Sequence, residues 1–365
     1  MKIAVYTIAL NEEQFVETWY NSAKNADYLL IADTGSTDGT IEKARELGIT
    51  VVPIAIKPWR FDDARNASLA LLPADIDMCI CLDMDEVLVE GWRELLETTT
   101  APQISYKYTW SWKDASEKVP GFVYAGNKVH ARFGYRWTDL IHEVLLPEQR
   151  FLEEHYEEYL EGFEIHHHPD QSKSRSSYID LLKVALAENS NNPRLTLYHA
   201  RELGARGLVS EAKSEFKRFL KIANPHNINE RSLAYRHLAQ IDPKNRESYL
   251  LKAAEITPTR REPLVSLAVY YFKQENWAHA LMYCNKALDI TFKTLDYTMG
   301  EYAWGYLPLN MKLASENNMK LDKKSTTYDE DKWKLNVDSI IATDFDLYGQ
   351  VDKKEEEQVL FEPDM

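Results

Sequence analysis

Three clusters of acidic, amide and hydroxyl side chains have the residue types that bind cations and phosphates. They are segment 83–86, Asp-Met-Asp-Glu, segment 33–40, Asp-Thr-Gly-Ser-Thr-Asp-Gly-Thr, and segment 10–13, Leu-Asn-Glu-Glu. Mg²⁺ and Mn²⁺ typically bind through one or two carboxylates plus the phosphate oxygens of a substrate. Asp83 and Asp85 leave the chain on the same side, because residues i and i+2 of an extended strand share a face. The first cluster therefore predicts a site for a divalent cation.

Each cluster follows an apolar run that predicts a buried strand. Four such runs alternate with stretches of helical spacing; they are 2–9, 28–32, 51–56 and 78–82. Continuous apolar runs that alternate with helices indicate a parallel sheet covered on both faces. Ligands bind beyond the carboxyl ends of the strands in such sheets, which is where the clusters lie. Further strands at 105–112 and 122–137 predict an α/β domain with a mostly parallel, mixed sheet. Asn11 is the predicted N-cap of the first helix, with Gln14 three residues on.

The second half of the chain reads as helical and repeats with a period of 34 residues. Ala200, Ala234 and Ala268 lie 34 apart, at a spacing typical of the small residues of tetratricopeptide-like repeats. The middle unit fits less well, because Arg246 stands where a small residue is expected. A plain helical bundle is the alternative. We expect an α/β domain over 1–170, an all-α repeat domain over 171–312, and a partly mobile extension over 313–365.

Composition excludes several classes of protein. The net charge of −15 disfavours a broad nucleic-acid surface, which needs clustered Lys and Arg. Three cysteines cannot all pair, and no run reaches the roughly 18 to 20 apolar residues of a membrane span. The chain is therefore expected in the cytoplasm. A dinucleotide cofactor is disfavoured because no Gly-x-Gly-x-x-Gly follows the first strand, and no Walker sequence occurs. A nucleoside diphosphate held through a metal ion is the remaining prediction.

The first 170 residues resemble glycosyltransferase family 2, the nucleotide-sugar transferases of the GT-A fold. The resemblance rests on four segments in the order and spacing of that family: 7–13, 33–40, 62–66 (Asp-Asp-Ala-Arg-Asn) and 83–86. The last is a variant of the Asp-x-Asp motif. Residues 141–143, Ile-His-Glu, resemble the His-Glu element of the branch whose members carry helical repeats.

The resemblance implies transfer of a hexose-type sugar from a UDP-sugar, with Mn²⁺ or Mg²⁺ as cofactor. Asp85 would bind the metal directly, Asp83 would hold the ribose or the metal, and His142 would complete the metal shell or touch the diphosphate. The nucleotide would contact the following residues: Leu10, Asn11, Glu12, Asp33, Gly35, Ser36, Arg65, Asn66 and Asp83.

Inversion of configuration in one displacement is expected of this family, and it needs a carboxylate base for the acceptor. Glu143 is the first candidate and Asp139 the second. The acceptor is open between a saccharide, a lipid-linked glycan, a peptide and a small molecule. The repeats suit a homodimer contact or a protein partner.

Structural readings compete with these roles. Asp33 and Asp38 suit a turn and a helix cap, and Asn66 is as well suited to a structural hydrogen bond as to a ligand. His142 also fits a core position. The triplet 166–168, His-His-His, is better explained as a polar strand end than as a metal site, although one imidazole can approach the site. Aromatic residues at alternate positions favour sheet packing over sugar stacking; these are Trp110, Trp112 and Trp137.

Two other functions remain open from the sequence. One is an interaction scaffold with a degenerate transferase domain, because 34-residue repeats are usually interaction surfaces. Intact acids at three strand ends argue against that reading. The other is a nucleotidyltransferase, which the lack of a Gly-rich, basic phosphate loop after the first strand disfavours.

Overall fold

The computed structural model describes residues 1–110, 120–153, 155–170 and 178–321. The chain divides into two compact units, Met1–Ala185 with Thr294–Tyr297, and Leu186–Lys293 with the residues from Thr298 on. The first unit thus extends past the expected boundary at 170. Trp112 and the greater part of the expected C-terminal extension lie outside the described residues.

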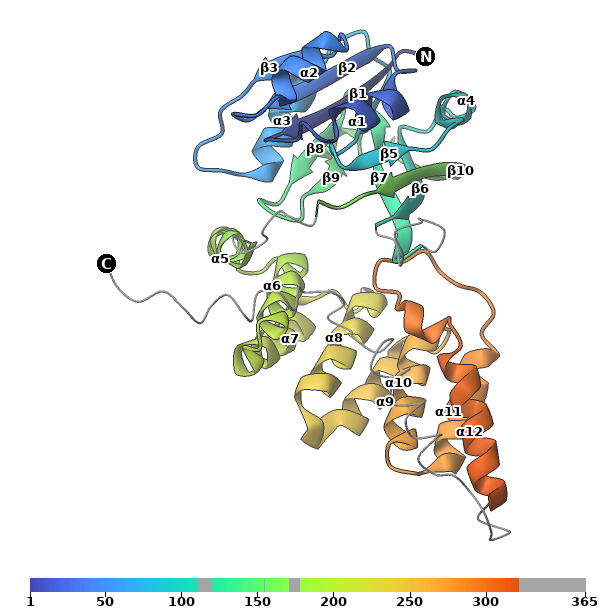
Figure 1. Ribbon diagram of the computed structural model, residues 1–365. Helices are drawn as coiled ribbons and strands as arrows, with labels where there is room; N and C mark the ends of the chain where they lie inside the picture. The colour runs from blue at the N-terminus through green and yellow to red at the C-terminus, as the bar shows by residue number, and fades with distance from the viewer. Residues whose placement is uncertain (111–119, 154, 171–177, 322–365) are drawn as a thin grey trace. The chain divides into compact units, whose positions relative to one another are not determined.

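The first unit is built on one mixed sheet of eight strands (Figure 1). In sheet order the strands are β3 (Thr50–Pro53), β2 (Tyr28–Asp33), β1 (Ile3–Ala9), β4 (Met78–Cys81), β7 (Val123–Ala131), β6 (Gln103–Thr109), β10 (Glu157–His167) and β5 (Glu86–Leu88). The first four are parallel, whereas β7 runs antiparallel to both β4 and β6, and β5 runs antiparallel to β10. The predicted mixed sheet is confirmed.

Both faces of the central strand β1 are buried, which explains its continuous apolar run. Ile3 and Val5 face a core that includes Trp19. That core is covered by α1 (Val16–Ala23), α2 (Thr40–Glu46) and α4 (Trp92–Leu96). Ala4 and Tyr6 face a second core, covered by α3 (Phe61–Ala70) and by the hairpin of β8 (Tyr135–Thr138) and β9 (Val144–Pro147). The sheet therefore presents its strand ends, rather than its faces, to a ligand.

The predicted start of the first helix is wrong. Helix α1 begins at Val16, and its N-cap residue, Phe15, makes no side-chain capping bond. Asn11 instead adopts a left-handed backbone conformation with φ of 54° in the loop after β1. Asn is among the residues that tolerate this conformation best, so the position still suits its residue type.

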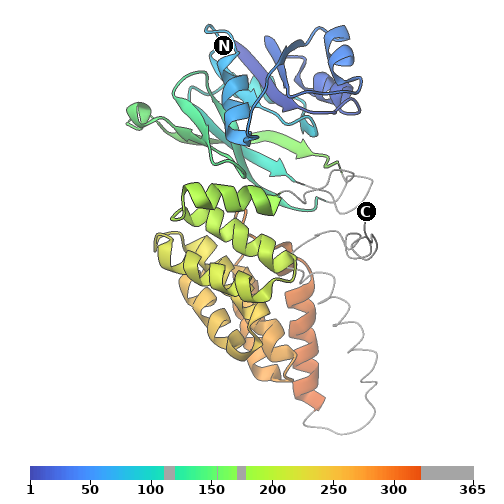
Figure 2. The same cartoon turned by 90° about the vertical axis from the view of Figure 1, so that its left-hand side faces the viewer.

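The second unit is all-α, and its helices stack in succession along the chain (Figures 1 and 2). Helix α5 (Tyr178–Glu188) crosses from the first unit, and the others are α6 (Pro193–Ala205), α7 (Val209–Ile222), α8 (Ile228–Ile241), α9 (Arg246–Ile256), α10 (Arg261–Phe272), α11 (Trp277–Leu288) and α12 (Leu307–Leu321). Three short 3-10 helices are η1 (Gln149–Phe151) in the first unit, and η2 (Pro243–Asn245) and η3 (Glu301–Ala303) in the second.

Helices of the second unit pack in consecutive pairs, α6 with α7, α8 with α9, and α10 with α11. Ala200, Ala234 and Ala268 lie in the first helix of each pair, and all three are completely buried. The pairing agrees with the 34-residue period, while membership of the tetratricopeptide class stays a prediction. Helix α12 packs on α11 and runs past residue 312, so the expected extension begins inside a helix.

All three cysteines are free and buried, and Cys79 and Cys81 face the same core. Among the residues that the structure describes, no helix is long and apolar enough to cross a membrane.

Candidate functional site

The loops after β1 and β2 are joined by hydrogen bonds between backbone and side chain. The Asn11 N–H donates to Ser36 Oγ at 2.9 Å, and Asn11 Oδ1 accepts from the Thr37 N–H at 2.8 Å. The Glu12 N–H donates to Thr40 Oγ1 at 2.8 Å. Strands β1 and β2 are adjacent and parallel, with Ala9 opposite Asp33, so their carboxyl ends share one edge. The two predicted clusters therefore form one continuous surface.

Asp33 shapes the turn that follows β2. Its side chain is buried, and its Oδ2 accepts from the Gly35 N–H at 2.9 Å and from the Ser36 N–H at 3.1 Å. Gly35 has φ of 120°, a conformation that requires glycine. Leu10, by contrast, is half exposed beside this turn. The contacts of Asp33 within the chain are therefore those of a carboxylate that stabilises a turn. The backbone of that turn contributes to the surface formed by the two loops.

Asp83 stands between two cations at the end of β4. Its Oδ1 lies 2.7 Å from Arg65 Nη1, and its Oδ2 lies 2.7 Å from Lys128 Nζ. Burial disfavours the charged carboxylate, but Arg65 and Lys128 outweigh burial and lower the pKa of Asp83 well below its ordinary value. Asp83 is therefore an anion whose charge is already compensated within the protein.

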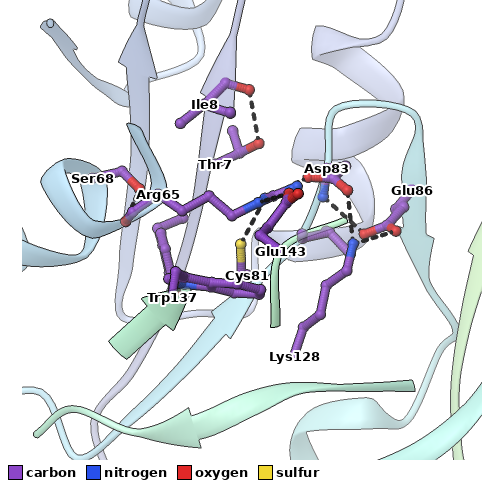
Figure 3. A network of polar contacts seen from close by, with 12 residues as sticks. Thr7, Ile8, Arg65, Ser68, Cys81, Asp83, Glu86, Lys128, Trp137 and Glu143 are labelled. Atoms are coloured by element: carbon purple, nitrogen blue, oxygen red, sulfur yellow. Dashed lines mark hydrogen bonds and ion pairs between the residues drawn. The ribbon is translucent and has the colours of Figure 1, made fainter. Parts of the chain in front are cut away.

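Lys128 extends this arrangement to Glu86, as Figure 3 shows. Lys128 Nζ lies 2.9 Å from Glu86 Oε1, which also accepts from the Tyr108 hydroxyl at 2.6 Å. Glu86 Oε2 accepts from the Asp83 N–H at 2.8 Å, and the Glu86 N–H donates to the Asp83 carbonyl at 2.9 Å. Glu86 is only 1% exposed. The turn 83–86 is thus held at both ends.

Arg65 links the turn to the loop between β8 and β9. Its Nε lies 2.5 Å from Glu143 Oε1, and its guanidinium lies over the Trp137 ring, 5.1 Å from the centroid. Arg65 Nη1 also donates to the Cys81 sulfur at 3.0 Å. Figure 3 shows the resulting row of alternating charges, which runs Glu143, Arg65, Asp83, Lys128, Glu86. We call these five residues the ion row.

Asp85 meets a histidine from β10. Its Oδ2 lies 3.0 Å from His167 Nε2, and the His168 N–H donates to the Asp85 carbonyl at 2.7 Å. His167 Nδ1 donates to the Trp110 carbonyl. Burial disfavours the imidazolium form, but the hydrogen bond and charge of Asp85 raise the pKa of His167 above its ordinary value.

The residues at this position fit a divalent cation. A carbonyl only accepts, so its bond fixes one proton of His167 on Nδ1, and the proton that Nε2 donates to Asp85 is the one that a cation would replace. A carboxylate oxygen and an imidazole nitrogen that face each other suit Mn²⁺ or Mg²⁺ as ligands. No group of three or more His, Cys, Asp or Glu side chains converges in this way within the described ranges, so phosphate oxygens and water would supply the other ligands.

The loop 139–143 carries three of the predicted residues. Asp139 and His142 both have left-handed backbones, with φ of 70° and 55°. The His142 ring packs edge-on against Tyr178, with ring centroids 6.0 Å apart. Asn66 Nδ2 donates to the Trp137 carbonyl at 2.8 Å, and Asn66 Oδ1 accepts from the Trp137 N–H at 3.0 Å. Asn66 therefore anchors the strand that leads into this loop.

The predicted residues Arg65, Asp83 and Glu143 come together in the ion row. Sequence reasoning missed two residues of the site. His167 had a signal in the histidine triplet, although the structural explanation of the triplet was preferred. Lys128 had none, because it lies within an ordinary strand sequence.

Comparisons with known proteins connect part of the chain with glycosyltransferases. No family model matches. An uncharacterised glycosyltransferase of Rickettsia bellii is 33% identical over 108 residues, which are 29% of this chain and 35% of that protein. The lipopolysaccharide core biosynthesis glycosyltransferase LpsC of Rhizobium meliloti is 27% identical over 161 residues, 40% of this chain and 58% of LpsC. The chain thus spans roughly one third to three fifths of the length of these relatives.

Solved structures align over similar portions. Glucosyl-3-phosphoglycerate synthase from Mycobacterium tuberculosis, in complex with Mn²⁺, UDP-glucose and phosphoglyceric acid, aligns with a TM-score of 0.34 at 17% identity. That alignment covers 51% of this chain and 77% of the other. A second structure of the synthase, with Mn²⁺, UDP and phosphoglyceric acid, has a TM-score of 0.25 at 27% identity and covers 29% of this chain and 43% of the other.

Proposed function

We propose that the first unit is a metal-dependent glycosyltransferase with a GT-A fold that transfers a hexose-type sugar from a UDP-sugar. The observation that carries the proposal is that the two aspartates of the turn 83–86, at the end of β4, have different partners. Asp83 is held by Arg65 and Lys128, whereas Asp85 is directed at His167. Sequence similarity to two glycosyltransferases supports the same class. We further propose that the chain belongs to family 2, in the branch with tetratricopeptide-like repeats.

The joined loops after β1 and β2 would receive the nucleoside. Their backbone is fixed by Asn11, Ser36 and Thr40, and half-exposed Leu10 provides an apolar contact for a base. Parallel strand ends are the usual ligand position in open α/β sheets. The diphosphate would then lie toward β4, the next strand of the sheet.

The residues around β4 fit the charge changes of sugar transfer. Asp85 and His167 would hold Mn²⁺ or Mg²⁺, which neutralises the charge of the departing diphosphate. Arg65 supplies a protein cation at the end of β4, where it pairs with Asp83. The resemblance gave His142 a role in the metal shell or at the diphosphate. In the structure His142 lies in the loop 139–143, which also carries Asp139 and Glu143, the two candidates for the base.

The acceptor base is proposed to lie in the loop 139–143, and the reaction is proposed to invert configuration. Arg65 holds Glu143 as an oriented carboxylate 2.5 Å away. Asp139 belongs to the same loop and is the second candidate for the base. Comparing Glu143→Gln with Asp139→Asn therefore decides which of the two accepts the proton. The acceptor itself is proposed to be a saccharide, a peptide or a small molecule, with the helical unit as its dock or as a protein contact.

The test is UDP release from a panel of UDP-sugars with Mn²⁺, using the full chain. Asp85→Asn should lower the rate at least about 10²-fold, because a metal ion supplies several kcal/mol of charge stabilisation in the transition state. Asp75→Asn is the matched control, since Asp75 forms only an exposed pair with Lys2. Undiminished release by the Asp85 variant, or an equal loss in the control, would contradict the metal role.

A further inference from the structure

Lys128 occupies a position that an irregularity in strand β7 creates. Opposite β6, Ile104 pairs with Val129 and Tyr106 pairs with Gly126, so three steps along β7 match two along β6. This is a β-bulge with one extra residue in β7, and Lys128 lies inside it. Bulges re-aim side chains and are frequent beside active sites.

Gly126 lies at the bulge, opposite Tyr106, where a side chain would not fit. A Cβ atom on Gly126 would lie 2.8 Å from Tyr106 Cε2, closer than real side chains pack. The Tyr106 ring therefore lies directly against the backbone of β7, and its hydroxyl accepts from the Lys128 N–H at 3.4 Å. The local backbone is thus arranged around Lys128 by close packing.

The Lys128 ammonium joins two carboxylates that come from one short turn. It lies 2.7 Å from Asp83 Oδ2 and 2.9 Å from Glu86 Oε1. Burial opposes its charge, but Asp83 and Glu86 raise its pKa well above the ordinary value. Without this cation, Asp83 would keep only its pair with Arg65 and Glu86 would lose its ion pair, so both acids could compete with Asp85 for a metal ion. The turn would also lose these two contacts with β7.

We propose that Lys128 is a positioning residue for the metal site. Its ammonium holds Asp83 and Glu86 in the ion row and fixes the turn, so that Asp85 alone of the three acids is directed at His167. This inference rests on the proposed function, because it concerns the metal ion that Asp85 and His167 are proposed to bind. It goes further by assigning the selection of one metal-binding carboxylate to a lysine that pairs with the other two acids of the turn, Asp83 and Glu86.

The experiment is a Mn²⁺ titration of the full chain with UDP present, in which free Mn²⁺ is followed by electron paramagnetic resonance. Lys128→Met removes the charge and keeps the aliphatic stem. It should weaken Mn²⁺ binding about 10- to 100-fold, the range seen when outer partners of metal ligands are removed. Lys128→Arg should recover part of that loss, since it restores the charge with a different geometry.

Two further variants keep the test decisive. Lys128→Met combined with Glu86→Gln removes the buried unpaired carboxylate and keeps the protein folded if the single variant unfolds. Its Mn²⁺ binding should stay weakened, because Asp83 still lacks its second cation. Lys107→Met, which removes a positive charge from β6 that pairs with Glu164, is the control and should bind Mn²⁺ normally.

The outcomes separate this inference from the proposed function. If the unsubstituted protein binds Mn²⁺ and UDP but Lys128→Met binds Mn²⁺ equally or more tightly, the inference is overturned alone. Full recovery in the double variant, or no recovery with Arg, also overturns it. If the unsubstituted protein binds neither Mn²⁺ nor UDP, the proposed function and the inference fail together.

Discussion

Each unit of the molecule contains a network of ions, and the two networks are built differently. In the helical unit Glu262 is 1% exposed, pairs with Arg260 at 3.1 Å, and accepts from Trp304 Nε1 and the Gly300 N–H at 3.2 Å. Its partners belong to the helices and turns that it joins. In the α/β unit Asp83 of the ion row is 29% exposed and lies two residues from Asp85.

The difference separates an ionic group that stabilises a fold from one that can serve chemistry. The Glu262 carboxylate accepts hydrogen bonds from protein donors. These bonds connect α10 to the segment 300–304. The ion row is partly open to solvent, and it neutralises two acids while a third is left beside an imidazole. Exposure to solvent, rather than the number of charges, distinguishes the ion row from the network around Glu262.

Breaking the network of the helical unit should give the largest change in stability. Arg260→Met leaves Glu262 without its ion partner, which should cost about 3–5 kcal/mol of the free energy of unfolding. Urea unfolding followed by circular dichroism measures this loss, and UDP release per folded molecule should stay unchanged. Arg93→Met is the control, because Arg93 pairs with partly exposed acids, and its loss should be below about 1 kcal/mol. A fall in UDP release by folded Arg260→Met would erase the distinction between the networks.

The second prediction concerns His167 on strand β10. His167→Ala should raise the Mn²⁺ concentration for half-maximal UDP release at least about 10-fold, because it removes the imidazole that faces Asp85. His166→Ala is the matched control: His166 is the adjacent residue and pairs with Glu164 at 3.3 Å. Equal effects of the two variants would mean that the triplet acts only as a strand end.

The smallest effect is expected at Asn66. Asn66→Ala removes both partners of the Trp137 backbone and should lower the free energy of unfolding by about 1–2 kcal/mol. The KM for the UDP-sugar should not change, because the amide is occupied by these two bonds. Unchanged stability together with a raised KM would instead support the direct nucleotide contact expected from the sequence.

Sequence reasoning predicted the strands and the acidic clusters because both depend on local patterns. The runs that form β1, β2 and β4 are buried on both faces, so their apolar character is continuous and easily read. The clusters follow these strands directly, so a parallel sheet brings them to one edge. Arg65 was found through a segment of the resemblance, although its partners Asp83 and Glu143 come from other elements.

The residues that were missed or misread depend on pairing between distant segments. Lys128 reaches Asp83 only because β7 pairs with β4 out of sequence order and contains a bulge. His167 reaches Asp85 because β10 pairs with β5, with His167 opposite Glu86. Asn11 was misread as a helix cap, since its bonds to the loop after β2 compete with helix initiation. No local pattern specifies any of these contacts.

The hydrogen bonds between the loops after β1 and β2 have a consequence for molecular recognition. Asn11, Glu12 and Thr40 fix this surface through contacts within the chain itself. A ligand that binds there contacts a preorganised surface, so the loops lose little conformational entropy on binding. For the proposed nucleoside site, this means that discrimination between bases would come from the shape of a preformed surface, with little structural adjustment on binding.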